Sequence, residues 1–286
     1  MHINFVYLQL KRAQDALKTW KAKFVINFLI YWSTENIPTD SIDHNITILY
    51  KKGDRSHCGN YRGISLLSVV GKVFTDIILQ RLKNLAELIY AHSQSGYRSG
   101  RSTIDGIFTL RQLMEKSREQ RRNMYIAFVD FTKAFDTVNR DLLYSILGRL
   151  GCPAKFVRII KELYTNVHAR LVVDGELTNP FEYNSGVKQG CKRAPTLYGI
   201  YAAVLLWLAY KEIKHTHSIQ VRFRYDGDLF DLRRLKSKSK VLAVYIREAQ
   251  YADDVAIFSD TPAGLTNEKF GFWSNTHCFS FCGVDA

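Results

Sequence analysis

Gln250-Tyr251-Ala252-Asp253-Asp254-Val255-Ala256-Ile257-Phe258 is the most informative stretch of this sequence. Two short runs of β-prone residues flank a pair of aspartates, and aspartate suits tight turns because its side chain bonds to nearby backbone groups. The pattern therefore predicts two short strands joined by a tight turn at Asp253-Asp254. Adjacent carboxylates on rigid strands are suited to bind hard divalent cations. Aspartate pairs are also common in ordinary turns, so a plain surface turn is the alternative interpretation.

A second apolar segment, Tyr125-Ile126-Ala127-Phe128-Val129-Asp130-Phe131, also ends near an aspartate. A short continuous apolar run is typical of a strand that is buried on both faces. Asp130 would then stand where the strand leaves the core. If this strand and the aspartate hairpin are neighbours in one sheet, we expect Asp130, Asp253 and Asp254 to meet at its edge. Alternatively, Asp130 caps a helix or lies on the surface.

Helices and strands are mixed along the rest of the chain. Apolar residues recur at helical spacing over residues 70–82, 104–114 and 156–163. Ser102 with Asp105 forms a capping pair at the start of the second of these helices. Because hairpins accompany the helices, the predicted class is α+β, with mixed α/β as the alternative. The other expected elements are a strand over residues 46–50, helices over 70–82, 139–150, 156–163 and 195–211, and a hairpin at Asp174-Gly175.

The charge balance points to a polyanionic partner. The 286 residues carry a net charge of +13 with a pI of about 9.5, which is typical of a protein that binds nucleic acid or an anionic membrane surface. A merely basic soluble protein is an equal alternative on charge alone. No segment reaches the ~18–20 apolar residues needed to span a bilayer. The five cysteines are scattered and odd in number, so we expect free thiols and an intracellular protein of the nucleus or cytoplasm, not a secreted one. His277, Cys278 and Cys282 lack a second ligand pair nearby, which disfavours a zinc site.

Five motifs occur in order between about Ile46 and Leu265. They are Tyr50–Asp54 with Asn60–Leu67, Ser93–Arg98 with Gly100–Asp105, Ala127–Asp136, Ser185–Cys191, and Tyr251–Asp254. In this order they resemble the reverse transcriptase of non-LTR (LINE-type) retrotransposons. The resemblance implies a right-hand polymerase with fingers and an antiparallel palm sheet backed by helices, and with the thumb missing.

The resemblance also implies a role for each matching residue. Catalysis would depend on two Mg²⁺ ions, or Mn²⁺ in their place, and the partners would be an RNA template, a DNA primer and dNTPs, with no membrane and no obligate protein partner. Phe135 would exclude a 2′-hydroxyl as a steric gate, or else is a core aromatic; Lys52 and Arg62 have a plain alternative as solvated surface cations. The implied set is Asp130, Asp253 and Asp254 as catalytic metal ligands, Lys52, Arg62, Phe135, Gln189 and Gly190 for the nucleotide, and Tyr97, Arg98 and Arg101 for template and primer.

The implied organisation leaves two segments unmatched. We predict an N-terminal helical extension (1–44), fingers (45–124 and 140–184), a palm (125–139 and 185–262, with a basic and partly mobile insertion at 211–248) and a divergent tail (263–286). Lys192-Arg193 stands where the family has small or apolar residues, and the tail does not resemble a thumb. The main alternative is therefore an inactive, truncated remnant that at most binds nucleic acid. An RNA-templated RNA polymerase is a third interpretation, which Phe135 disfavours.

Overall fold

The computed structural model describes residues 25–131, 133–173, 175–189, 194–211, 218–224, 235 and 240–267. The chain forms two compact units. The first unit is made of Met1–Arg81 and Tyr144–Ala194, and the second is made of Leu82–Leu143 and Pro195–Ala286. Each unit is therefore built from two separated stretches of the chain, and the next paragraphs describe the units one at a time.

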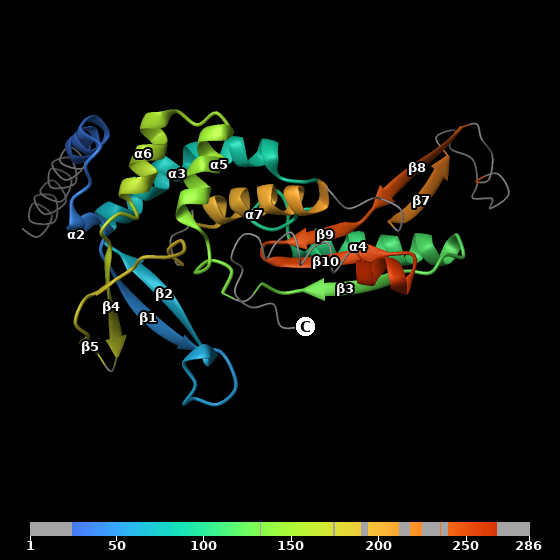
Figure 1. Cartoon of the computed structure of the whole chain (residues 1–286), viewed down its shortest axis with the longest axis horizontal. Coiled ribbons are helices and arrows are strands. Elements are labelled where there is room, and N and C mark those ends of the chain that lie inside the picture. The colour runs from blue at the N-terminus through green and yellow to red at the C-terminus, as the bar shows by residue number, and fades with distance from the viewer. Residues whose placement is uncertain are drawn as a thin grey trace, which may run out of the picture. The chain divides into compact units, whose positions relative to one another are not determined.

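The first unit is built on a mixed sheet with strand order β2-β1-β4-β5, in which β6 also pairs with β4 (Figure 1). The central strand β1 is antiparallel to β2, with Tyr50 opposite Tyr61, and parallel to β4, with His44 opposite Ala169. A loop that includes the short 3₁₀ helix Cys58–Asn60 joins β1 to β2. The strands are β1 (His44–Tyr50), β2 (Tyr61–Leu67), β4 (His168–Val173), β5 (Glu176–Leu177) and β6 (Phe181–Glu182).

Helices supply the core of the first unit. Residues 25–34 are helical, and the rings of Phe28 and Tyr31 meet Phe74 edge-on at 4.8 and 5.4 Å between centroids. Helix α6 buries Phe156, Ile159 and Ile160 on one side, as its helical spacing predicts. The helices are α2 (Thr39–Ile42), α6 (Ala154–Glu162), the first part of α3 (Val69–Ile89) and the second part of α5 (Arg140–Arg149).

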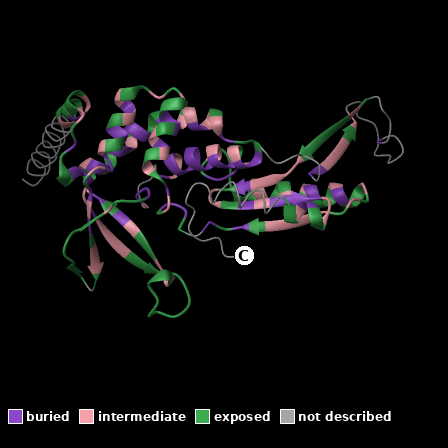
Figure 2. Ribbon diagram, in the orientation of Figure 1, coloured by how far each residue is buried: buried purple, intermediate pink, exposed green. Residues whose placement is uncertain are grey.

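The second unit is built around a three-stranded antiparallel sheet in the order β3-β10-β9. Helix α4 packs on it through Leu113, which forms a core cluster with Phe258 of β10 and Ile219 of β7. Helix α7 is apolar nearly all round and mostly buried (Figure 2). A second hairpin pairs β7 with β8. The elements are β3 (Tyr125–Val129), β7 (Ile219–Arg224), β8 (Val241–Ile246), β9 (Glu248–Tyr251), β10 (Asp254–Ser259), α4 (Thr103–Glu119) and α7 (Ala194–Lys211).

The structure confirms the predicted elements and the mixture of helices and strands. At the start of α4 the Asp105 carboxylate accepts the Ser102 backbone N–H at 2.7 Å and the Ser102 hydroxyl at 3.0 Å, as expected for a capping pair. These two bonds lower the pKa of Asp105. Asn139 caps α5 by accepting the Leu142 N–H at 3.0 Å. Strands β4 and β5 form the expected hairpin after Val173, although Asp174 itself lies outside the described residues.

One expectation about burial is wrong. The segment 125–131 was expected to be a strand buried on both faces, but Phe128 is 75% exposed. The physical reason is that Phe128 lines an open apolar hollow with Ile107 and Leu110 of α4, so the described part of the chain does not cover its ring. Strands β2, β7 and β8 are present although the sequence pattern did not predict them. No helix in the described part of the chain is long and apolar enough to cross a membrane.

Several predicted segments fall partly or wholly outside the described residues. The basic insertion (211–248) contributes β7 and β8, while residues 212–217, 225–234 and 236–239 lie outside the description. Residues 1–24 of the N-terminal extension, Gly190 to Arg193, and the tail from residue 268, with its histidine and two cysteines, also lie outside it. The division into fingers and palm stays a prediction at this point.

Candidate active site

The aspartate hairpin has a two-residue turn. Tyr251 at the end of β9 pairs with Asp254 at the start of β10, so Ala252 and Asp253 form the turn between them. Ala252 has a φ of 60°, which an alanine rarely adopts because its Cβ crowds the backbone. A positive φ at the first turn position suits the twist of a two-residue hairpin. The turn therefore carries backbone strain beside two carboxylates.

Asp130 comes to the same end of the sheet through the strand register. Strand β3 is antiparallel to β10, and Val129 is the partner of Val255. Continuing this register by one residue places Asp130 across from Asp254. The three aspartates that the sequence singled out thus gather at one end of a single sheet, within one unit of the chain.

The electrostatics of this cluster are those of crowded carboxylates. Partial burial raises the pKa of Asp254, and the negative charges of Asp253 and Asp130 raise it further. No group of three or more His, Cys, Asp or Glu side chains in the described ranges is arranged closely enough to hold a metal ion as it stands. The donor chemistry nevertheless fits a hard cation, because carboxylate oxygens are the ligands that Mg²⁺ prefers and a cation would offset their repulsion.

An aromatic cluster lies beside the carboxylates. The ring of Phe135 stacks on Tyr198 of α7, with 4.7 Å between centroids, and Tyr97 meets it edge-on at 6.1 Å. Burial raises the pKa of Tyr198 well above its usual value, and Asp253 and Asp254 contribute to that shift. Phe135 is only 5% exposed, so its ring is held by packing as a core aromatic is. That packing is compatible with its predicted second role as a steric gate.

The first unit brings together two other predicted residues. The guanidinium Nε of Arg62, on β2, donates to the side-chain oxygen of Gln189 at 3.1 Å, across 127 positions of sequence. The neighbouring backbone bond runs from Ser65 N–H to the Gln189 carbonyl at 2.6 Å. Lys52 is exposed in the loop between β1 and β2, and Gly190 lies outside the described residues.

A buried lysine, which sequence reasoning missed, supports the contact between Arg62 and Gln189. Lys188 precedes Gln189, is buried, and donates to the carbonyls of Ile42 at 2.7 Å and Leu163 at 2.9 Å. Its ammonium also lies 5.4 Å from the ring centre of Tyr164. Because a buried ammonium is stable only when its donors are satisfied, these contacts fix the backbone next to Gln189. Its place inside the motif Ser185–Cys191 is the signal that could have drawn attention to Lys188, because its residue type alone indicates no such role.

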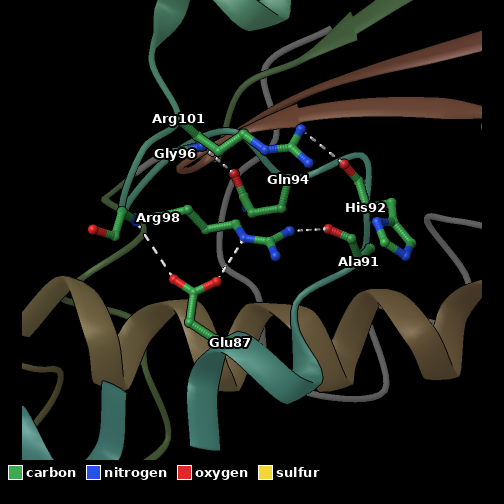
Figure 3. Close-up of polar contacts among 8 residues, drawn as sticks. Glu87, Ala91, His92, Gln94, Gly96, Arg98 and Arg101 are labelled. Atoms are coloured by element: carbon green, nitrogen blue, oxygen red, sulfur yellow. Dashed lines mark hydrogen bonds and ion pairs between the residues drawn. The ribbon is translucent and has the colours of Figure 1, made fainter. Parts of the chain in front are cut away.

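The predicted template segment forms a network of its own (Figure 3). Arg98 pairs with Glu87 at 2.9 Å and donates to the Ala91 carbonyl at 3.1 Å, and its side chain is 14% exposed. Arg101 reaches the His92 carbonyl at 3.5 Å, whereas Tyr97 is exposed and has a φ of 58°. Arg98 is thus engaged within the chain, and Tyr97 and Arg101 offer more accessible groups.

A comparison with family models decides the affiliation. The model described as reverse transcriptase (RNA-dependent DNA polymerase) matches residues 49–269, more than half of the chain. This chain belongs to the reverse transcriptase family. All three aspartates, Phe135, Arg62 and Gln189 of this reverse transcriptase domain fall inside the matched range.

Curated relatives place the domain near the polymerases of non-LTR retrotransposons. It is 32% identical over 169 residues to the Transposon TX1 uncharacterized 149 kDa protein of Xenopus laevis, covering 59% of this chain and 13% of that protein. It is 24% identical over 220 residues to the Pol polyprotein of the type-1 element R2 of Bradysia coprophila, covering 74% of this chain and 22% of that protein. The domain is also 27% identical over 163 residues to the RNA-directed DNA polymerase of the mobile element jockey of Drosophila melanogaster, covering 56% of this chain and 18% of that protein. The chain spans less than a quarter of each of these three.

Solved structures support the fold of the reverse transcriptase domain. It is similar to apo telomerase from Candida tropicalis with a TM-score of 0.55, covering 93% of this chain and 47% of that one at 12% identity. Telomerase from Candida albicans in complex with a fragment of telomeric RNA gives a TM-score of 0.54 at 9% identity, covering 93% and 45%. At such identities the likeness concerns the fold alone.

Proposed function

We propose that this domain catalyses RNA-directed DNA synthesis, in which a primer 3′-hydroxyl attacks the α-phosphate of a dNTP. The 3′-hydroxyl gives up its proton to solvent, the new bond joins the 3′-oxygen to the α-phosphorus, the bond from that phosphorus to the bridging oxygen breaks, and pyrophosphate leaves. The observation that supports this proposal best is the strand register that sets Asp130 across from Asp254, with Asp253 in the adjoining turn. Rigid strands suit such a site because positional error strongly lowers the rate.

Asp130 and Asp253 would be the direct metal ligands, and Asp254 a third ligand or a tuner of the field. The family generally uses Mg²⁺, and two bound ions would stabilise charge on the attacking and leaving oxygens. The three aspartates gather negative oxygens at one sheet end, and their side chains would close further around the cations when these arrive with the triphosphate.

The nucleotide contacts are proposed from the family pattern and from the contacts in the first unit. Arg62 and Lys52 would bind the triphosphate, because guanidinium and ammonium groups form charge-assisted bonds with phosphate oxygens. Gln189 and Gly190 would contact the new base pair and its sugar. The bond between Arg62 and Gln189 supports a shared task for these two residues. Phe135 would exclude the 2′-hydroxyl of a ribonucleotide, since its ring is too tightly packed to move aside.

The template and primer would lie along the segment that carries Tyr97, Arg98 and Arg101. We propose Tyr97 for stacking and Arg98 and Arg101 for backbone contacts, with Arg98 exchanging its present partners when nucleic acid binds. In the same scheme the fingers comprise residues 45–124 and 140–184, and the palm comprises 125–139 and 185–262. Affinity for template–primer should fall steeply with salt, because each phosphate contact releases counterions.

The test is primer extension on an RNA template with dNTPs and Mg²⁺. Asp253→Asn should lower the extension rate by about a thousandfold or more, since loss of metal stabilisation removes several kcal/mol. Asp54→Asn is the matched control: Asp54 also lies in the turn region of a hairpin, where it accepts the Ser56 N–H at 2.9 Å. The control should retain wild-type activity. Equal activity of all three proteins, or a wild-type product that does not require Mg²⁺, would contradict the proposal.

A second candidate is favoured by one sequence feature, the Lys192-Arg193 pair that replaces small or apolar residues after Gln189-Gly190-Cys191. An inactive remnant that binds nucleic acid would yield no extension product while remaining folded. Mg²⁺-dependent dNTP binding without turnover, lost in Asp253→Asn, would indicate a remnant that preserves the site. RNA binding without any dNTP binding would indicate a nucleic-acid-binding remnant.

A further inference from the structure

The turn that carries Asp253 needs support from outside the hairpin. Ala252 has a φ of 60°, a conformation that is unfavourable for alanine and persists only where the surroundings hold it. Residues 252 and 253 are all that separates β9 from β10, so a change in Ala252 moves the Asp253 carboxylate directly. The position of Asp253 therefore depends on whatever holds Ala252.

Gln94 is the side chain that holds it. The Oε1 atom of Gln94 accepts the backbone N–H of Ala252 at 3.0 Å and the backbone N–H of Gly96 at 2.7 Å. Its Nε2 atom lies 3.4 Å from both the Ala252 carbonyl and the Gln250 side-chain oxygen, which are long contacts. Gln94 is 4% exposed, and it lies 158 positions before Ala252 in the sequence. Figure 3 shows its amide turned toward Gly96.

The backbone around Gln94 is fixed to the same strand. Ser95 N–H donates to the Gln250 carbonyl at 2.9 Å, and Gln250 N–H donates to the Ser93 carbonyl at 3.0 Å. These bonds form a short parallel bridge beside β9. Gly96 completes the fit, because a Cβ at that position would lie only 2.1 Å from the Ala252 nitrogen. Residues 93–96 thus follow the hairpin as far as its turn.

We propose that Gln94 is a positioning residue, which keeps Ala252 in its strained conformation and thereby fixes the carboxylate of Asp253. An amide suits this task because its oxygen can accept two backbone N–H groups at once while remaining neutral beside three aspartates. The catalytic consequence of this inference rests on the proposed function, but the structural part does not. The two parts can be tested separately.

The structural test is amide hydrogen exchange at Ala252 in Gln94→Met. Methionine preserves the length and volume of the side chain but lacks a strong acceptor. We expect exchange of the Ala252 amide to accelerate about tenfold or more, with the rest of the sheet unchanged, because the amide loses its partner. Gln112→Met is the matched control, since the side chain of Gln112 bonds to Glu115 on its own helix α4. Unchanged exchange at Ala252 in a folded Gln94→Met protein would overturn the inference, whatever the activity.

The conservative variant and the kinetics separate positioning from general stability. Gln94→Glu retains an oxygen that can accept both N–H groups, and burial beside three aspartates keeps its carboxyl group protonated and neutral in acid, so exchange at Ala252 measured at about pH 4 should stay within about threefold of wild type. In primer extension, Gln94→Met should lower kcat about tenfold and leave the KM for dNTP within about twofold, since the nucleotide contacts are untouched. Faster exchange with unchanged kcat in an active enzyme would overturn the positioning role. If the wild type proves inactive, the proposed function fails and the exchange measurement alone decides whether Gln94 holds the turn.

Discussion

Two hairpins carry predicted site residues, and they are built in opposite ways. The hairpin of β9 and β10 turns in two residues, is held from outside by Gln94, and presents Asp253 and Asp254. The hairpin of β1 and β2 turns through residues 51–60, nearly all of them exposed, and presents Lys52 and Arg62. Within the described part of the chain its loop is held by local bonds, such as that of Asn60 Nδ2 to the Asp54 carbonyl at 2.7 Å.

Under the proposed function, the difference follows from the task of each hairpin. Metal ligands must be correctly placed before the substrate arrives, so their backbone is fixed by long-range contacts. Cations that bind a flexible triphosphate can adjust on long side chains, so an open loop serves them well. A substitution that disturbs the backbone should then lower stability and activity strongly in the hairpin of β9 and β10, and only slightly in the hairpin of β1 and β2.

The largest effect on stability is expected for Gly96→Ala, with Gly59→Ala as its control. A Cβ at residue 96 would lie 2.1 Å from the Ala252 nitrogen, whereas nothing lies within 4 Å of one at residue 59. Overpacking at Gly96 should lower the free energy of unfolding by about 1–3 kcal/mol. It should also lower the rate of primer extension, while Gly59→Ala stays within about 0.5 kcal/mol of wild type. Urea denaturation and primer extension measure both effects, and comparable losses in the two variants would remove the contrast.

A large change in specificity is expected for Phe135→Val. The ring that stacks on Tyr198 would be replaced by a smaller side chain, which opens space for a 2′-hydroxyl. The ratio of ribonucleotide to deoxynucleotide incorporation should rise by about 10–200-fold. Phe156→Val, in the core of the first unit, controls for simple loss of packing and should leave that ratio unchanged. A ratio that moves equally in both variants would assign Phe135 to the core alone.

In the open hairpin, Arg62→Gln should act on binding and not on the chemical step. Loss of a charge-assisted bond to phosphate should raise the KM for dNTP about tenfold, with kcat nearly constant. Arg55→Gln is a control from the same loop, where Arg55 lies 5.2 Å from the ring centre of Tyr50. A fall in kcat with unchanged KM would show that this hairpin needs the same rigidity as the other.

The smallest effect concerns Glu248, at the start of β9. Burial of its carboxyl group raises the pKa of Glu248 despite the nearby positive charge of Arg247. The folded state therefore keeps this proton to a higher pH than the unfolded chain, and the associated stability is lost as pH rises from about 4.3 through the folded-state value. Glu248→Gln removes that loss and should raise the Tm by about 2–4 °C at neutral pH. At pH 4 the two proteins should melt alike, and exposed Glu176→Gln should show no pH-dependent difference.

The sequence predicted the carboxylate hairpin well because its signals are local. Turn-forming residues lie between two β-prone runs, and the same is true of the hairpin that follows Val173. Strand β2 was harder to predict, because Arg62 and Gly63 interrupt its apolar pattern and its stability comes from pairing with β1. The exposure of Phe128 could not be inferred either, since the sequence does not show where helix α4 leaves the face of the sheet uncovered.

The parts of the site that escaped prediction depend on partners far away in sequence. Gln94 binds Ala252 across 158 positions, and Lys188 binds the Ile42 carbonyl across 146. Both residues lie inside motifs of the sequence, Ser93–Arg98 and Ser185–Cys191, but neither residue type nor spacing indicates that they are buried or which groups they bind. Motif order indicated which aspartates to examine, but only the strand register shows how Asp130 faces Asp254.

The edge position of β3 has a consequence for handling the protein. Tyr125 to Val129 is an uncharged, β-prone run without proline, and within the described part of the chain its outer edge has no partner strand. Such an edge presents backbone donors and acceptors that a second copy of the same strand can pair with. Concentrated preparations should therefore self-associate through β3, and a lysine in place of the exposed Phe128 would act as a gatekeeper against fibril-like stacking.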